Sequence, residues 1–330
     1  MDLAFLSLDL LGRPAWMWLG FLALVLGLLA LDLGVLSRRR GEIGVRGSLA
    51  LSAFYVGLGL AFGAWVWTGL GREAGLAWLT GFAVEKALAL DNVFVIALIF
   101  AHFAVPRALQ HRVLFWGILG VIVLRAVMIG FGAAIVSEFA WVLPLFAVFL
   151  IATGLKMIFT QEKPHDLADS RLLGWLKRRL RVTDRLEGER FFVRRAHPTT
   201  GAPVVWATPL FLALVMVETA DVVFAVDSIP AIFAITTDPF LVYTSNIFAI
   251  LGLRALYFAL AAMIERFRLM KYALAGVLVF IGGKVLAAEA LGIDEIPAAL
   301  SLAVTVALLA GGVVASLVAD RREARATAGE

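Results

Sequence analysis

Five carboxylic acids lie inside strongly apolar stretches of this chain and fall into two groups. Glu85 and Asp91 form the first group, and Glu218, Asp221 and Asp227 form the second. A charged side chain at the centre of a membrane-spanning helix costs about 2.5–3.5 kcal/mol on insertion scales, so five unpaired ones would cost on the order of 10–15 kcal/mol. Buried cations, protonation or a bound metal ion must therefore accompany these acids.

The two acidic groups share one spacing. In each, an acid is followed six residues later by Asp and then by a small amide or hydroxyl residue. Oxygen-only sites suit Mg²⁺, Ca²⁺ or Mn²⁺ and disfavour Cu and Zn, and the chain has no cysteine. The candidate metal ligands all carry side-chain oxygen atoms, and they are Glu85, Asp91, Asn92, Glu218, Asp221, Asp227 and Ser228.

Helical geometry separates some of these side chains. Six residues along an α-helix correspond to about 240° and about 9 Å, so Glu85 and Asp91 cannot share one face, and the same holds for Asp221 and Asp227. Glu218 and Asp221, three residues apart, do share a face. Convergence on one ion therefore requires that the helices unwind or lie at the centre of the bundle. Pro230 favours unwinding, because a proline inside a helix leaves the carbonyl four residues earlier without its hydrogen bond.

Buried basic residues offer a partial balance of charge. We expect Arg125 and Arg254, each of which follows an acidic group, to act in charge balance or gating, together with Asp32 near the end of the first apolar stretch. Lys86 directly follows Glu85 and therefore points to another face of its helix. Ion pairing alone would account for at most three of the five acids, so the others favour an ion site.

The whole chain is too apolar for a water-soluble globule. Of its 330 residues, 62% are hydrophobic and 16% are charged, and the mean hydropathy is +0.94. Soluble domains have roughly 45–50% apolar and about 25% charged residues. We predict an all-α integral membrane protein in which residues 1–330 form a single transmembrane domain. About nine transmembrane helices are expected, at 15–36, 47–69, 76–103, 113–136, 139–159, 204–235, 246–264, 272–291 and 297–318.

Two sets of three predicted helices repeat each other. Three matches support this: the acidic groups in the third and sixth helices, an Arg-Ala pair at 125 and 254 in the fourth and seventh, and a Gly-x-Lys triplet at 154 and 282 in the fifth and eighth. Because the two copies are offset by three helices, helices 3–5 and 6–8 would cross the membrane in opposite directions. Such an inverted three-helix repeat is typical of secondary transporters.

The basic residues predict the orientation. With the N-terminus outside, the segments expected in the cytoplasm carry 22 of the 29 Lys and Arg residues, and the external segments carry only Arg13 and Arg72, as the positive-inside rule requires. We predict a multi-pass plasma-membrane protein in contact with the lipid bilayer, with a basic cytoplasmic loop at 160–203 and a short cytoplasmic tail at 319–330. Within the loop, 171–180 is expected to form a basic interfacial helix. The net charge of +4 follows from this orientation and does not indicate nucleic-acid binding.

The motifs around the acids resemble those of a known family. Glu85-x₅-Asp91-Asn92, the stretch 218–231 (ETADVVFAVDSIPA) and the stretch 251–258 (LGLRALYF) closely resemble the signatures of the TerC/Alx family, over about residues 15–320. Members of this family look like manganese exporters within the lysine-exporter superfamily, although the family was first named for tellurium resistance. The resemblance implies Mn²⁺ export from the cytoplasm, with the acidic motifs as the metal site. Ala89 departs from the family, which usually has Ser there, and one possible hydroxyl ligand is therefore missing.

The expected function is export of a divalent metal ion, with Mn²⁺ before Ca²⁺ or Mg²⁺, and we expect neither an enzyme nor an organic cofactor. The sequence has no H-E-x-x-H, no G-x-S-x-G and no phosphate-binding loop. Two alternatives stay open. A membrane factor that supplies metal to secreted metalloenzymes would need a partner-binding surface on its short external loops. The second alternative is an exporter of another cation or of an organic solute, and an organic solute would need a larger and less acidic cavity.

Overall fold

The computed structural model describes residues 6–36, 45–139, 141–159, 171–196, 201–260, 269–292 and 297–327. Asp32, Asp91 and Arg254 lie in helices of this part, but their side chains are outside the described residues. Most of the described chain is helical, which confirms the predicted all-α fold.

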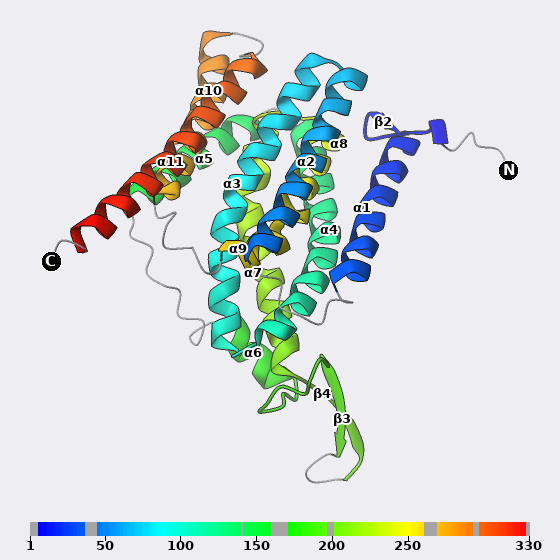
Figure 1. Ribbon diagram of the computed structural model, residues 1–330. Coiled ribbons are helices and arrows are strands. Elements are labelled where there is room, and N and C mark those ends of the chain that lie inside the picture. Colours follow the sequence, from blue (N-terminus) through cyan, green and yellow to red (C-terminus); the bar gives the residue numbers. More distant parts are fainter. Residues whose placement is uncertain are drawn as a thin grey trace.

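Eleven helices and four short strands follow one another along the described chain (Figure 1). The helices are α1 (Ala15–Leu36), α2 (Val45–Leu70), α3 (Arg72–His102), α4 (Arg107–Glu138), α5 (Val142–Phe159), α6 (Arg171–Arg179), α7 (Pro209–Phe233), α8 (Pro239–Leu251), α9 (Leu253–Leu260), α10 (Met270–Leu291) and α11 (Ala298–Thr327). The strands form two small antiparallel hairpins, β1 (Asp9–Leu10) with β2 (Arg13–Pro14), and β3 (Phe192–Ala196) with β4 (Pro203–Ala207).

Seven helical segments of the described chain are long and apolar enough to cross a membrane. They are α2 from Gly47, α4, α5, α7, the pair α8 and α9 over Pro239–Phe258, α10, and α11 up to Ala319. In addition, α1 is apolar over the shorter stretch Ala15–Leu31, and α3 has 31 residues but carries several charges. The protein is therefore a multi-pass membrane protein, while the count of nine crossings stays a prediction.

Most helices begin within four residues of their predicted starts, but α4, α7 and α8 begin further away. The helix expected from 113 begins at Arg107, and the other two begin at prolines. The helix expected from 204 begins at Pro209, because the residues before it pair as β4 with β3. The helix expected from 246 begins at Pro239. Asp238 caps this helix, because its Oδ1 atom accepts hydrogen bonds from the backbone N–H groups two and three residues further on, at 2.9 and 3.3 Å. Proline fits the first position of both helices, where the N–H group has no helical partner.

Pro230 does not interrupt α7, so the unwinding that we expected there is not observed. The helix is continuous from Pro209 to Phe233. Pro230 lies in its last turn, where the loss of one backbone hydrogen bond does not disturb the longer part that precedes it. A break comes instead at Gly252, between α8 and α9.

α3 and α7 lie at the centre of the bundle (Figure 1). α3 packs against α2, α7, α8 and α11, and α7 packs against α3, α4 and α5. Because α3 carries the first acidic group and α7 the second, this packing places the two acid-bearing helices side by side.

Aromatic side chains fix the position of α3. Phe62 of α2, Trp78 of α3 and Phe248 of α8 pack with ring centroids 4.7–5.9 Å apart, the usual range for aromatic pairs. Trp78 is fully buried and donates its Nε1–H to Thr244 Oγ1 at 2.9 Å. These contacts hold α3 against α2 and α8 two helical turns before Glu85.

α5 and α10 make a close, reciprocal contact. A Cβ atom at Gly154 of α5 would lie 2.8 Å from the carbonyl oxygen of Ala275, and one at Gly282 of α10 would lie 2.5 Å from that of Ala147. On both helices the glycine comes seven residues after the contacted alanine, and higher numbers on one helix meet lower numbers on the other. The two helices are therefore antiparallel, and the contact has two-fold symmetry, as in an isologous interface. An inverted repeat that relates α5 to α10 would produce this symmetry; the repeat over all three helices stays a prediction.

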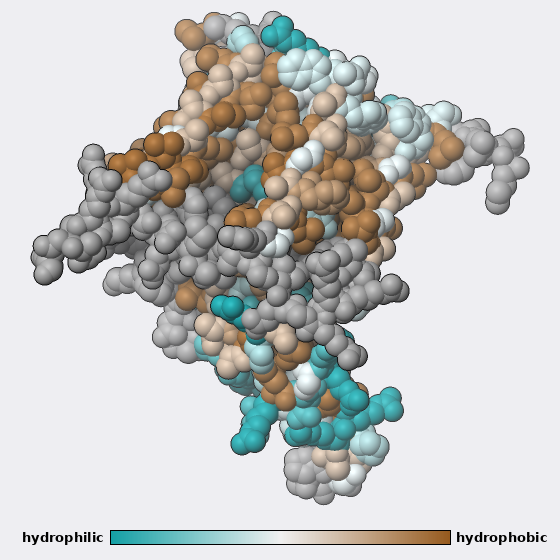
Figure 2. Space-filling model, viewed as in Figure 1, coloured by the Kyte–Doolittle hydropathy of each residue, from teal (hydrophilic) through white to brown (hydrophobic). Residues whose placement is uncertain are grey.

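Side-chain contacts connect segments that are expected on the same side of the membrane. At one end of the bundle, Arg13 Nε donates to Asp238 Oδ2 at 3.0 Å, and at the other end Arg112 Nη1 donates to Glu189 Oε2 at 3.0 Å. Figure 2 shows apolar side chains over much of the helical part and hydrophilic ones gathered near the β3–β4 hairpin. The molecule thus has an apolar helical part and a polar extension at one end.

Candidate functional site

Arg125 of α4 is the centre of a buried network of charged and polar side chains. It is fully buried. Its Nε and Nη2 atoms donate to the two carboxylate oxygens of Asp221 on α7, at 3.2 and 3.1 Å, and Nη1 donates to Glu85 Oε1 on α3 at 2.8 Å. The forked contact with Asp221 is the strong, bidentate geometry of an arginine–carboxylate pair. One cation thus holds a carboxylate from each acidic group.

Two neutral side chains complete the network around Arg125. Ser228 Oγ and Asn246 Oδ1 accept hydrogen bonds from Nη1 at 2.9 and 3.1 Å, and both side chains are buried. Ser228 follows Asp221 by seven residues on α7, which is about two helical turns, so the two point to the same side. Because Asn246 comes from α8, the network joins α3, α4, α7 and α8.

Four buried polar atoms in and near the network have no hydrogen-bond partner in the described part of the chain. They are Glu85 Oε2, Asn92 Oδ1, Glu218 Oε2 and Asn246 Nδ2. An unpaired buried polar group costs about 1–3 kcal/mol, and more when it is charged. Three of the four atoms are oxygen acceptors, the kind of atom that binds a hard cation.

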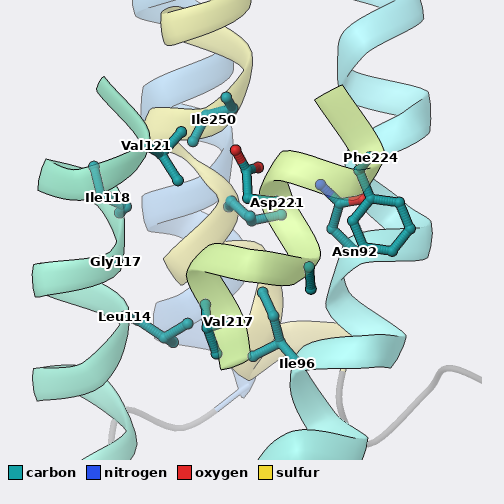
Figure 3. Close-up of a pocket in the computed structure, with 12 residues that line it drawn as sticks. Asn92, Ile96, Leu114, Gly117, Ile118, Val121, Val217, Asp221, Phe224 and Ile250 are labelled. Atoms are coloured by element: carbon teal, nitrogen blue, oxygen red, sulfur yellow. The ribbon is translucent and has the colours of Figure 1, made fainter. Parts of the chain in front are cut away.

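A small cavity adjoins the network. Its volume is about 30 Å³, and residues from α3, α4, α7, α8 and α9 line it. Asn92 and Asp221 are its polar lining residues, and apolar ones such as Ile96, Val121 and Phe224 form the rest of the wall (Figure 3). The space is large enough for a water molecule or a single ion. Asp221 therefore contacts Arg125 and also borders the cavity.

Glu218 lies one helical turn before Asp221 on α7 and packs against Gly120 of α4. A Cβ atom at position 120 would overlap Glu218 Oε1, so the carboxylate fills space that exists only because residue 120 is a glycine. Asp221 acts on Glu218 electrostatically as a like charge. Gly120 is therefore part of this site.

Asp227 lies on another side of α7. It is half-buried, and the charged group that acts on it is Lys156 of α5. Six residues separate it from Asp221, which in a continuous helix is a rotation of about 240°. The structure therefore separates Asp227 from the Arg125 network.

The predicted ligands are thus only partly assembled. Glu85, Asp221 and Ser228 meet at Arg125, with Asn92 and Glu218 beside them. In the part of the chain that the structure describes, no three His, Asp or Glu side chains are grouped around one metal position. The side chains of three further predicted site residues are outside that part, namely Asp32, Asp91 and Arg254.

Lys86 follows Glu85 directly and points to a different neighbour, as predicted. Its Nζ atom donates to the carbonyl oxygen of Ala249 at 2.9 Å, near the end of α8. A Cβ atom at Gly252 would lie 2.8 Å from the same Nζ atom. Lys86 therefore stabilises the break between α8 and α9 and takes no part in the Arg125 network.

The sequence analysis did not identify Asn246 or Gly120. Asn246 ends a Thr-Ser-Asn run inside an apolar stretch, and a polar side chain there is the same kind of signal as a buried acid. Gly120 gives no such signal, because its role depends on a side chain from another helix.

Fold and site together define a multi-pass membrane protein with a charged network at the centre of its helices. The family model described as "Integral membrane protein TerC family" matches residues 70–324. The chain belongs to the TerC family of integral membrane proteins, which confirms the resemblance seen in the motifs.

Similar proteins occur in distant bacteria. The protein named "Putative membrane-bound redox modulator Alx" in Escherichia coli (strain K12) is 46% identical over 312 residues, which cover 92% of this chain and 94% of the relative. A membrane protein of Rickettsia bellii is 46% identical over 301 residues, 91% of this chain and 97% of the relative. The Myxococcus xanthus membrane protein STKORF319 is 43% identical over 310 residues, 94% of each chain. No solved structure matches the chain.

Proposed function

We propose that this protein is a transporter that exports a divalent metal ion, with Mn²⁺ as the preferred ion, from the cytoplasm. The observation that carries the proposal is the excess of acids around one guanidinium. Glu85 and Asp221 contact Arg125, and Glu218 lies one helical turn before Asp221, which acts on it as a like charge. Counted as carboxylates, the three acids exceed the one guanidinium by two formal negative charges inside an apolar bundle. One divalent cation would cancel both, and buried charges in a membrane protein commonly mark an ion pathway.

The donor atoms favour a hard ion. The carboxylates and the Asn92 amide offer oxygen atoms as ligands, which suits Mn²⁺, Mg²⁺ and Ca²⁺ and disfavours Cu and Zn. Among the hard ions, Mn²⁺ is preferred because the acidic motifs resemble those of manganese exporters in the TerC/Alx family.

The position of the site supports movement of the ion and not only its storage. The network lies where α3 packs against α7, the two helices that open the predicted repeats. The symmetric α5–α10 contact is consistent with two halves that can exchange arrangements, and transporters built from inverted repeats bind their ions between such halves.

The proposal places the protein in the plasma membrane with its N-terminus outside. The chain has no cysteine, so Asp169→Cys and Thr237→Cys can each be made without a background thiol. An impermeant thiol reagent should label position 237 and not position 169 on intact cells. The reverse pattern would overturn the orientation and the direction of transport with it.

Other functions make different demands on the structure. The name of the Escherichia coli relative points to redox modulation, but this chain has no cysteine for thiol–disulfide exchange. An organic solute would need a larger and less acidic cavity than the one of about 30 Å³ beside Asp221. A membrane factor that supplies metal to other proteins would bind the ion without moving it. The proposal includes no enzymatic step and no organic cofactor.

Flux measurements on purified protein in liposomes test the proposal. Wild-type protein should move Mn²⁺ across the bilayer, with Ca²⁺, Mg²⁺ and Zn²⁺ as competitors that define selectivity. Glu85→Gln keeps the side-chain shape but removes a charge that the ion needs, so flux should fall at least about tenfold. Glu73→Gln, exposed at the start of the same helix, is the matched control and should not change it.

Two results would count against export. Wild-type flux in a folded Glu85→Gln protein would show that the carboxylate network does not handle the ion. Tight Mn²⁺ binding by wild-type protein without flux would favour the metal-supplying factor instead.

A further inference from the structure

Arg125 takes up the carboxylate oxygens that a transported cation would need. Its guanidinium occupies both oxygens of Asp221 and one oxygen of Glu85, at 2.8–3.2 Å. An arginine does not lose its proton in a protein, so its charge stays in the bundle throughout a transport cycle. A metal ion can bind these oxygens only if the guanidinium releases them.

A second set of acceptors lies within reach of the same group. Nη1 already contacts Ser228 Oγ and Asn246 Oδ1 at 2.9 and 3.1 Å, and both acceptors are neutral. They could keep the guanidinium hydrogen-bonded after the carboxylates turn to a metal ion. A bound metal ion and the guanidinium would repel each other strongly where water is excluded, which favours release of the carboxylates by Arg125.

We propose that Arg125 is the resident counter-cation of the site. It holds Glu85 and Asp221 when the site is empty, and it moves onto Ser228 and Asn246 when the metal ion takes the carboxylates. This inference rests on the proposed function. Asn246 is then a positioning residue, because it acts on the ion through Arg125.

Arg125 should affect how the empty transporter returns to the cytoplasmic side. With Arg125 in place, the buried carboxylates of the empty site are paired, so the helices can rearrange without a second ion. Net export passes through this empty state in every cycle. Exchange of one metal ion for another empties the site only on one side of the membrane and does not require the empty protein to rearrange. Net export should therefore need Arg125 far more than exchange does.

A purely structural arginine would behave differently. Removing a partner from a buried ion pair destabilises the protein, so folding, metal binding, exchange and net export would then fall together.

The experiment compares two fluxes in liposomes loaded with radiolabelled Mn²⁺. Net efflux is measured into metal-free buffer, and exchange is measured with unlabelled Mn²⁺ outside. For Arg125→Gln we expect net efflux to fall at least about tenfold while exchange stays within about threefold of wild type, since only the empty state loses its cation. Mn²⁺ affinity, measured by calorimetry, should be unchanged or higher.

Two further variants complete the test. Asn246→Leu removes a neutral acceptor and should lower Mn²⁺ affinity about tenfold, because release of the carboxylates becomes harder. Arg72→Gln, exposed at the start of α3, is the matched arginine control and should leave both fluxes unchanged.

The outcomes separate the inference from the function on which it rests. If wild-type protein shows neither flux, the proposed function fails. If wild-type protein shows both, the inference alone is overturned when a folded Arg125→Gln protein loses them in equal proportion or keeps full net efflux. Should Arg125→Gln not fold, unchanged Mn²⁺ affinity in Asn246→Leu would overturn it as well.

Discussion

Asp221 and Asp227 lie six residues apart on one helix, yet their surroundings differ. Asp221 is buried, and Arg125 holds both of its carboxylate oxygens. Asp227 is half-buried, with Lys156 of α5 as the charge that acts on it. Because α7 is continuous through Pro230, the helix turns the two side chains to different neighbours. The comparison shows that matched positions in two sequence motifs need not belong to one binding site.

Neutralising Asp221 and Asp227 one at a time should show the difference between their surroundings most clearly. Asp221→Asn replaces the forked carboxylate contact with Arg125 by a single amide oxygen, so we expect about 1.5–3 kcal/mol less stability and no Mn²⁺ efflux. Asp227→Asn should keep most of its efflux, because this carboxylate lies outside the Arg125 network, next to Lys156. Its stability should change by less than about 1 kcal/mol, as for a partly exposed surface charge. Thermal unfolding in detergent and liposome flux measure both quantities, and equal stability losses would contradict the distinction.

The α5 helix carries Lys156, the charge that acts on Asp227. The position of α5 can be tested through its contact with α10. Gly282→Ala would place a methyl group 2.5 Å from the backbone oxygen of Ala147, and a backbone atom cannot give way easily. We expect a loss of about 1–3 kcal/mol, typical of overpacking. The neighbouring variant Gly283→Ala meets nothing within 4 Å and is the control. If both variants unfold at the same temperature, the contact is looser than described.

The surroundings of Asp221 can be tested at Gly120 of α4, where we expect the smallest effect on stability. Gly120→Ala must displace the Glu218 carboxylate, and efflux should fall about tenfold if this acid helps to hold the ion. Stability should change by about 1 kcal/mol or less, because alanine is the better helix former and offsets part of the strain. Gly130→Ala, on the same helix with open space around it, should keep wild-type efflux. A Gly120→Ala protein with full efflux would remove Glu218 from the ion site.

Residue type and local sequence were sufficient to predict the class of the protein and most members of its central network. A carboxylate or guanidinium inside an apolar stretch is conspicuous wherever it lies, which is why Glu85, Arg125 and Asp221 could be selected. Helical periodicity also predicted that Asp227 would not share a face with Asp221. The expected unwinding at Pro230 was wrong, because the position of a proline within the helix decides its effect.

The rest of the site depends on contacts between helices, which the sequence does not encode locally. Gly120 matters only because Glu218 of another helix fills the space beside it. Asn246 matters because α8 begins at Pro239 and places the amide within 3.1 Å of Arg125. The forked pairing of Arg125 with Asp221 likewise depends on how α4 packs against α7.

Lys86 connects the helix break at Gly252 to the charged network, because it follows Glu85 on α3. Its ammonium lies at the C-terminal end of α8, where the helix dipole has its negative pole and the last carbonyls lack helical partners. The residue before it, Glu85, holds Arg125. Neighbouring residues of one helix are fixed about 100° apart and cannot turn independently. Any torsion of α3 that withdraws Glu85 from Arg125 must therefore also shift Lys86 at the end of α8, so that the charge of the site and the joint between α8 and α9 respond to the same twist.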